Sequence, residues 1–123
     1  MKITTFNPMI ITKDAEAVIK VFETLGFERR HTTKENINDA DITSVRMTDP
    51  NGFHIDVAEA HVDKDISTIR MNVDDFDEAY NFLTERGFKN SQGERTTETG
   101  SSKATLMVSP SGFSINLVEH IKK

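Results

Sequence analysis

Short runs in which apolar and polar residues alternate predict strands in each half of the chain. The runs Phe6–Thr12 and Ser67–Val73 place β-branched apolar residues between polar ones, a pattern typical of strands. After each run the apolar residues change to helical spacing, which predicts helices over Asp14–Leu25 and Asp75–Arg86. Each predicted helix ends just before a glycine, a residue that adopts the left-handed conformation at low cost.

Three further runs follow each predicted helix and predict three strands in each half. A Pro-x-Gly turn precedes the last strand of both halves. Each half is therefore predicted to be a βαβββ module. The predicted strands are Phe27–Thr33, Ile42–Thr48 and Phe53–Ala58 in the first half, and Phe88–Gln92, Ala104–Val108 and Phe113–Glu119 in the second.

The two halves also resemble each other residue by residue. Residues 49–59 align with residues 109–119 at an offset of sixty, and Pro, Gly, Phe, Ile and Glu are identical at five of the eleven positions. Earlier in each half, Gly26-Phe27 aligns with Gly87-Phe88 at an offset of sixty-one. Matches that occur in the same order in both halves indicate that one module was duplicated.

The 123 residues are predicted to form one domain with two modules, about 1–61 and 62–123. In the strand before residue 59, Phe53, Ile55 and Val57 alternate with His54 and Asp56, so one strand face is apolar and the other polar. We therefore predict an α+β fold in which both modules form an open, curved, mixed sheet. The helices pack on its convex face, and the polar concave face is available to a ligand.

Composition and charge argue against several classes of function. The formal net charge is −5, and Lys and Arg are dispersed among acidic residues, which argues against a nucleic-acid partner. Because the sequence contains no cysteine, neither a disulfide nor thiolate chemistry is expected. No apolar run approaches the roughly 20 residues of a membrane helix, and no signal-peptide pattern begins the sequence. We therefore expect a cytoplasmic protein with no membrane partner.

Three segments, residues 12–14, 25–27 and 49–57, resemble sequence signatures of the vicinal-oxygen-chelate superfamily. This superfamily includes glyoxalase I, fosfomycin-resistance proteins, extradiol dioxygenases and bleomycin-resistance proteins. The resemblance implies that metal-using members take their ligands from the first and last strands of each module. In this chain the corresponding positions are Asn7 and Thr68 on the first strands, and Asp56 and Asn116 on the last strands.

The residues at these four positions are poor ligands for a first-row metal ion. The resemblance implies histidine and glutamate as the usual ligands, whereas this set offers one carboxylate and three neutral groups. His54 shares a strand face with Asp56 and adds a second candidate ligand, but a third is missing. We therefore predict no metal and no other cofactor, and we interpret His54 and Asp56 as polar residues that line a ligand cleft.

Two arginines complete the set of candidate ligand-binding residues. Arg46 and Arg70 interrupt apolar strands, and their alternation with Met47 and Met71 turns both toward the predicted concave face. Either they hold an anionic or carbonyl-bearing ligand, or each pairs with a neighbouring acid such as Asp56. We assign no catalytic residue, because the sequence has neither a nucleophile elbow nor a Gly-rich phosphate loop.

Three functional hypotheses follow. The first is a small-molecule-binding protein that sequesters its ligand without a metal, in a concave or dimer-interface cleft, as the resemblance to bleomycin-resistance proteins implies. A homodimer is expected, since an open sheet leaves unpaired edges. The second is a glyoxalase-like lyase or isomerase, or a dioxygenase, with an atypical metal site around His54 and Asp56. The third is a non-catalytic sensor or assembly module. The polar segment 90–103 is predicted to contain a loop that either covers a pocket or has no ligand role.

Overall fold

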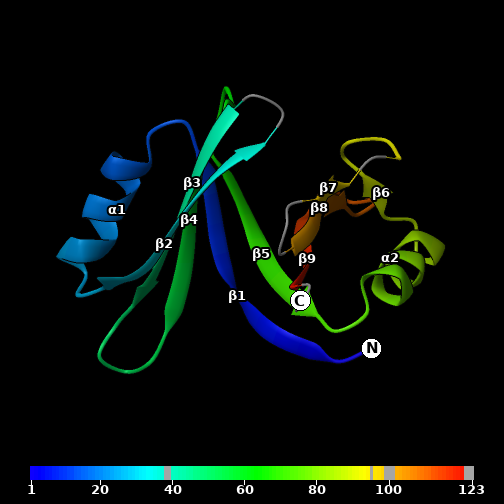
Figure 1. Cartoon of the computed structure of the whole chain (residues 1–123), viewed down its shortest axis with the longest axis horizontal. Helices are drawn as coiled ribbons and strands as arrows, with labels where there is room; N and C mark the ends of the chain where they lie inside the picture. The colour runs from blue at the N-terminus through cyan, green and yellow to red at the C-terminus, as the bar shows by residue number, and fades with distance from the viewer. Residues whose placement is uncertain (38–39, 95, 99–101, 121–123) are drawn as a thin grey trace. The chain divides into compact units, whose positions relative to one another are not determined.

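The computed structural model describes residues 1–37, 40–94, 96–98 and 102–120. Its secondary-structure elements follow the order βαβββ in the first half and repeat it in the second, with one additional short strand (Figure 1). The chain forms two compact units, residues 7–67 and residues 1–6 with 68–123. The predicted α+β class and the two βαβββ modules are therefore confirmed. In the described ranges, no helix is long and apolar enough to span a membrane.

The unit of residues 7–67 contains a mixed sheet with strand order β2-β3-β4-β1. Strands β2, β3 and β4 are antiparallel neighbours, and β1 runs parallel to β4. A shift in register between Arg29 and His31 interrupts the pairing of β2 with β3. The elements are β1 (Ile3–Thr12, which begins in the other unit), α1 (Ala15–Thr24), β2 (Glu28–Ile37), β3 (Ala40–Thr48) and β4 (His54–Glu59).

Helix α1 packs on one face of this sheet (Figure 1). The helix begins where the Asp14 side chain accepts a hydrogen bond from the Ala17 amide, 3.2 Å long. It ends before Gly26, whose φ of +103° lies in a region that side-chain-bearing residues avoid. Because apolar residues recur at helical spacing, one helix face is buried against the strands. The core consists of Ala15, Ile19, Val45, Met47, Ile55 and Val57.

The unit of residues 1–6 and 68–123 repeats this arrangement. Its strands are ordered β5-β9-β8-β6, with β5 parallel to β9, and the short strand β7 pairs with β8. Asp75 begins the helix by accepting a hydrogen bond from the Glu78 amide, 3.0 Å long. The elements are β5 (Ile66–Val73), α2 (Phe76–Glu85), β6 (Lys89–Asn90), β7 (Thr97–Glu98), β8 (Ser102–Val108) and β9 (Ser114–His120).

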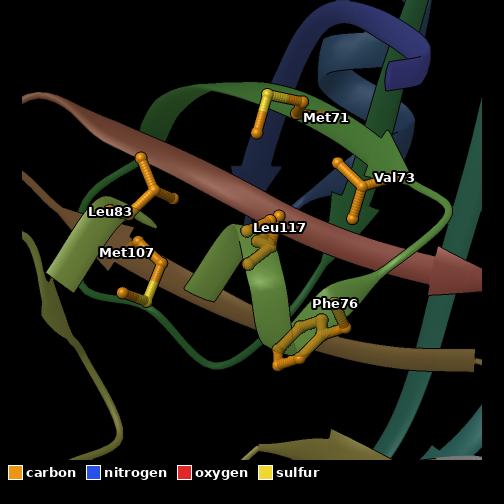
Figure 2. Close-up of a cluster of buried hydrophobic side chains, with 7 residues drawn as sticks. Met71, Val73, Phe76, Leu83, Met107 and Leu117 are labelled. Carbon is orange, nitrogen blue, oxygen red and sulfur yellow. The ribbon is translucent and has the colours of Figure 1, made fainter. Parts of the chain in front are cut away.

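Helix α2 and three strands of this unit contribute the side chains of its core. Figure 2 shows the apolar side chains of β5, α2, β8 and β9 gathered into one cluster. Phe76 is the first residue of α2, lies in this cluster and is only 3% exposed. The first turn of α2 therefore packs against the sheet. The cluster consists of Met71, Val73, Phe76, Ala79, Leu83, Met107 and Leu117.

Residues that are identical in the two halves hold equivalent backbone groups. The carboxylate of Glu59 accepts a hydrogen bond from the Ala15 amide, 3.3 Å long, and that of Glu119 accepts one from the Phe76 amide, 2.9 Å long. Both amides belong to the first turn of a helix, where no helical carbonyl is available as a partner. The turn before each last strand is held in a similar way, by the side chains of Asp49 and Ser109.

The helix bounds agree with the prediction, whereas one strand region of the second half differs from it. The strand predicted over residues 88–92 is reduced to β6, because the Asn90 side chain accepts a hydrogen bond from the Gln92 amide, 2.9 Å long, and bends the chain. Segment 90–103, which was predicted to contain a loop, also contains β7 and the start of β8. Its residues 95 and 99–101 lie outside the described residues.

Candidate functional site

The face of the first sheet opposite α1 carries polar side chains from three neighbouring strands. The residues that flank Arg46 and Asp56 along their strands belong to the core, so these two side chains point to the other face. Arg46 stands opposite Asp56 in the pairing of β3 with β4, and Met9 stands opposite Asp56 in the pairing of β1 with β4. Asn7 lies two residues before Met9 and shares its face. Strand register therefore gathers Asn7, Arg46 and Asp56.

Asp56 is the centre of this group and is only 1% exposed. Arg46 donates from Nε to Oδ1 of Asp56, 3.1 Å, and from Nη2 to Oδ2, 3.2 Å. Asn7 Nδ2 also donates to Oδ2, 2.8 Å. A buried carboxylate needs both a counter-ion and hydrogen-bond donors to remain charged. Arg46 and Asn7 supply both.

The side-chain amide of Asn7 is held in one orientation. Its Nδ2 atom donates to Asp56 and also to the backbone oxygen of Pro8, each at 2.8 Å. Turning the amide over would place its oxygen against these two acceptors, so the orientation is determined by its neighbours. Oδ1 is buried and has no hydrogen-bond partner among the described residues. An unpaired acceptor of this kind costs about 1–3 kcal/mol of stability.

His54 has different surroundings from Asp56, although the two residues share a strand face. The His54 side chain is exposed, and its Nδ1 atom lies 2.9 Å from Thr48 Oγ1. Asp56 is buried against Arg46. The possible metal-ligand pair predicted from sequence thus consists of one exposed and one buried group with separate partners. Thr48 was not predicted as a site residue, because its position opposite His54 follows only from the strand register.

The second sheet carries a different set of polar groups on the face opposite α2. Ser114 Oγ donates to Oγ1 of the buried Thr68, 2.8 Å. Arg70 Nε donates to Asn72 Oδ1, 3.1 Å, and Arg70 stands opposite Asn116 in the pairing of β5 with β9. Ser114 and Asn72 were not predicted as site residues. The internal repeat offered a signal for Ser114, because its counterpart in the first half is one of the predicted residues.

The structure brings together some of the predicted ligand-binding residues within each unit. In the unit of residues 7–67, Asn7, Arg46 and Asp56 form one hydrogen-bonded group, and His54 lies beside it on the same strand face. In the other unit, Thr68, Arg70 and Asn116 share one face of the sheet. Ligand binding by these residues stays a prediction.

The donor set does not fit a first-row metal ion. Among the four residues that the resemblance suggests as ligand positions, Asp56 is the one carboxylate, and the Arg46 guanidinium already neutralises it and repels a cation. Asn7 Oδ1 is a neutral amide oxygen, and amide oxygens bind such ions weakly compared with imidazole or thiolate. Within the described ranges, no three His, Cys, Asp or Glu side chains are grouped so as to hold a metal ion. The polar side chains of this face are instead joined by hydrogen bonds.

Comparison with known proteins identifies the superfamily whose fold this chain has. A sequence model of the glyoxalase/bleomycin resistance protein/dioxygenase superfamily matches residues 4–117. No curated protein matches the chain. Methylmalonyl-CoA epimerase from Mycobacterium tuberculosis is similar in structure, with 17% identity, a TM-score of 0.67, and coverage of 98% of this chain and 90% of that one.

Two further solved structures have the same fold. A superfamily member from Vibrio splendidus has 14% identity and a TM-score of 0.60, and the match covers 96% of this chain and 99% of that one. A glyoxalase I variant from Zea mays has 12% identity and a TM-score of 0.64, with coverage of 98% of this chain and 44% of that one. At these identities the likeness concerns the fold alone.

Proposed function

Because the chain belongs to the glyoxalase/bleomycin resistance protein/dioxygenase superfamily, we propose that it is a small-molecule-binding protein that works without a catalytic metal. The site is the polar face that carries Asn7, Arg46 and Asp56, with His54 at its side. A small organic molecule binds there through hydrogen bonds and is sequestered. Arg70, Thr68 and Asn116 of the second module belong to the proposed ligand-binding set.

The observation that carries this proposal is that the Asp56 carboxylate already has a counter-ion and hydrogen-bond donors. Arg46 and Asn7 together give it three hydrogen bonds, two to Oδ2 and one to Oδ1. A metal ion would have to displace the guanidinium and would leave Arg46 without its counter-ion. Because the Arg46 side chain is 31% exposed, this loss costs less than the roughly 3–5 kcal/mol of breaking a fully buried ion pair. An organic ligand avoids this cost, since it can bind to Arg46 and Asn7 with the ion pair intact.

The unpaired oxygen of Asn7 supports the same proposal. Oδ1 is a buried acceptor with no partner among the described residues, whereas Nδ2 of the same amide has two acceptors. An N–H or O–H group of a bound molecule, or a water molecule, would satisfy it, because buried polar groups are normally hydrogen-bonded. Binding of a donor group here recovers part of the cost of the unpaired atom.

We also propose that the protein forms a homodimer. Among the described residues, β2 is the outermost strand of one unit and β6 that of the other, so each unit has an edge strand with backbone groups that no neighbouring strand pairs. Large apolar side chains are exposed as well, among them Phe6, Phe53 and Phe113 at 62%, 66% and 53%. Sedimentation should show a species of twice 13.9 kDa at micromolar concentration. A species of 13.9 kDa alone would contradict the dimer.

A thermal-shift screen of small organic molecules tests the proposed function. We expect at least one class of compound to raise the melting temperature of the wild-type protein, because a ligand that binds only the native state stabilises it. The shift should be lost in Asp56→Ala, where Arg46 and Asn7 lose the group that positions them.

The matched control is Asp63→Ala. Asp63 is an exposed aspartate of the same unit, so this variant should keep the full shift. Equal shifts in both variants would show that binding occurs elsewhere. No shift with any class of compound in the wild-type protein would contradict the binding function itself.

A further inference from the structure

The geometry points to a ligand that carries a carboxylate, or a comparable two-oxygen acceptor group, bound to the outer edge of the Arg46 guanidinium. This inference rests on the proposed function, since it names the chemical class that the same face would bind. It departs from the overall charge of −5, which by itself would favour a cationic ligand.

The guanidinium of Arg46 is planar and offers two edges on which a pair of oxygens can be bound. Asp56 occupies the edge formed by Nε and Nη2, with bonds of 3.1 Å and 3.2 Å. Asp56 does not occupy the other edge, which is formed by Nη1 and the second hydrogen of Nη2. Among the described residues, Arg46 donates to Asp56 from Nε and Nη2, and no acceptor is bonded to Nη1. A carboxylate matches this second edge in spacing and in planarity.

The exposure of the ion pair decides which charge a ligand meets. The Asp56 side chain is 1% exposed, whereas that of Arg46 is 31% exposed. A molecule that approaches this face therefore contacts the cation, and the anion lies beneath it. His54 is also exposed and adjoins the pair, because Thr48 and His54 stand opposite each other two residues along the strands from Arg46 and Asp56. Within the group of Asn7, Arg46 and Asp56, the accessible charge is therefore that of the guanidinium, and the carboxylate is buried.

Asp56 acts here as a positioning residue. Two hydrogen bonds to one carboxylate fix the plane of the guanidinium, and the bond from Asn7 fixes the carboxylate in turn. A pre-oriented guanidinium loses less conformational freedom on binding than a free side chain would. Arg46→Lys retains the charge but removes the planar edge, so it separates bidentate recognition from simple charge attraction.

The test uses three probes with the same ring and different charge: benzoate, benzamide and benzamidinium. Each is titrated into the full-length, nitrogen-labelled protein, and the arginine Nε–H signals and backbone amides are followed by NMR. The Arg46 signal is assigned by its loss in Arg46→Lys. We expect benzoate to shift the Arg46 Nε–H signal and to bind about tenfold more tightly than benzamidinium, with benzamide in between.

Two variants show whether the binding uses the second edge of Arg46. Arg46→Lys should weaken benzoate binding about tenfold, the effect of losing one charge-assisted hydrogen bond. Arg86→Lys is the matched control, because Arg86 lies over the ring of Phe82 in the other unit. It should bind benzoate as the wild-type protein does. The amide spectrum of each variant reports whether it is folded.

The comparison of probes in the wild-type protein needs no variant and can overturn the inference alone. Benzamidinium binding at this face as tightly as benzoate would overturn it, and so would unchanged benzoate affinity in Arg46→Lys. An Arg46 signal that no probe moves would also overturn it. In each of these cases the proposed binding function is tested separately, by the thermal-shift screen with other classes of compound.

Discussion

At equivalent points of the repeat, the two modules carry different side chains on the face opposite their helix. In the first module Asp56 pairs with Arg46 on the neighbouring strand. In the second module the same two positions hold Asn116 and Leu106, which also stand opposite each other. Arg70, which lies on this face of the second module, comes from its first strand instead. Because the second module has no ion pair at the equivalent positions, the pair is a feature of the first module's face and is not part of the repeated scaffold.

The positions that build the scaffold show the opposite behaviour. Glu59 and Glu119 each bind an amide in the first turn of a helix, and Asp14 and Asp75 each cap one. These residues serve backbone groups that are the same in both modules, so the same side chains suit both. The comparison separates residues that maintain the fold from residues available for ligand chemistry.

The largest expected loss of stability comes from removing the ion pair of Asp56 and Arg46. Asp56→Ala should lower the free energy of unfolding by about 3 kcal/mol, since it leaves Arg46 without a counter-ion and Asn7 without an acceptor. The equivalent change, Asn116→Ala, should cost about 1 kcal/mol, because Asn116 is neutral and half-buried. Urea unfolding of both variants measures the difference. Equal costs would mean that the two faces are not distinguished by the ion pair.

Alanine substitutions at the two glycines that follow the helices should also differ in how much stability they cost. Both have positive φ, +103° at Gly26 and +90° at Gly87. A Cβ at Gly87 would lie 2.8 Å from Pro110 Cγ, whereas one at Gly26 would meet nothing within 4 Å. Gly26→Ala should therefore cost about 1 kcal/mol for backbone strain alone, and Gly87→Ala about 2 kcal/mol. The same urea measurement applies, and a larger loss at Gly26 would contradict the assignment of the clash.

A smaller effect is expected at the glutamates that bind the helix amides. Glu119→Gln and Glu59→Gln remove a negative charge beside a helix N-terminus, which is worth about 0.3–1 kcal/mol. Glu119 should show the larger loss, because its hydrogen bond is 2.9 Å long and that of Glu59 is 3.3 Å long. Thermal unfolding of the two variants ranks them. The reverse order would mean that hydrogen-bond length does not determine the contribution.

The smallest effect concerns a surface ion pair of the first module. The hydrogen bond from Arg29 lowers the pKa of Glu16 below its ordinary value of 4.5, and the nearby positive charge lowers it further. A depressed folded-state pKa gives stability that is present above the unfolded pKa and is lost as the pH falls through the folded one. Glu16→Gln should therefore melt slightly below the wild-type protein at neutral pH, and this difference should vanish in acid, once the pH falls below the lowered pKa of Glu16. A difference that persists in acid would have another cause.

The fold was predictable from sequence because its signals are local. Asp14 and Asp75 begin the helices and a glycine follows each one, and these residues act through their own backbone neighbourhood. The early end of β6 was not predictable in the same way. It depends on the Asn90 side chain, which bends the chain after residue 90 and also accepts a hydrogen bond from Thr105 on β8.

The candidate site was predictable in part. The family resemblance and the internal repeat selected Asn7 and Asp56, and alternation selected Arg46. The structure places the three in one hydrogen-bonded group. The sequence left open whether Arg46 pairs with Asp56 or only with a ligand, and the structure shows the pairing with Asp56. The unpaired oxygen of Asn7 and the contact of His54 with Thr48 depend on strand register and side-chain orientation. Periodicity carries no information on either.

The metal content of the protein tests the central claim most directly. The protein is purified without added metal, one portion is equilibrated with Zn²⁺ and another with Ni²⁺, and each is desalted and measured by elemental analysis. The claim predicts far less than one ion per chain in every sample, because Asp56 is neutralised by Arg46 and lacks two further strong ligands. A stoichiometric ion that is retained in Asp63→Ala and lost in both Asp56→Ala and His54→Ala would contradict the claim and establish a metal site at this face.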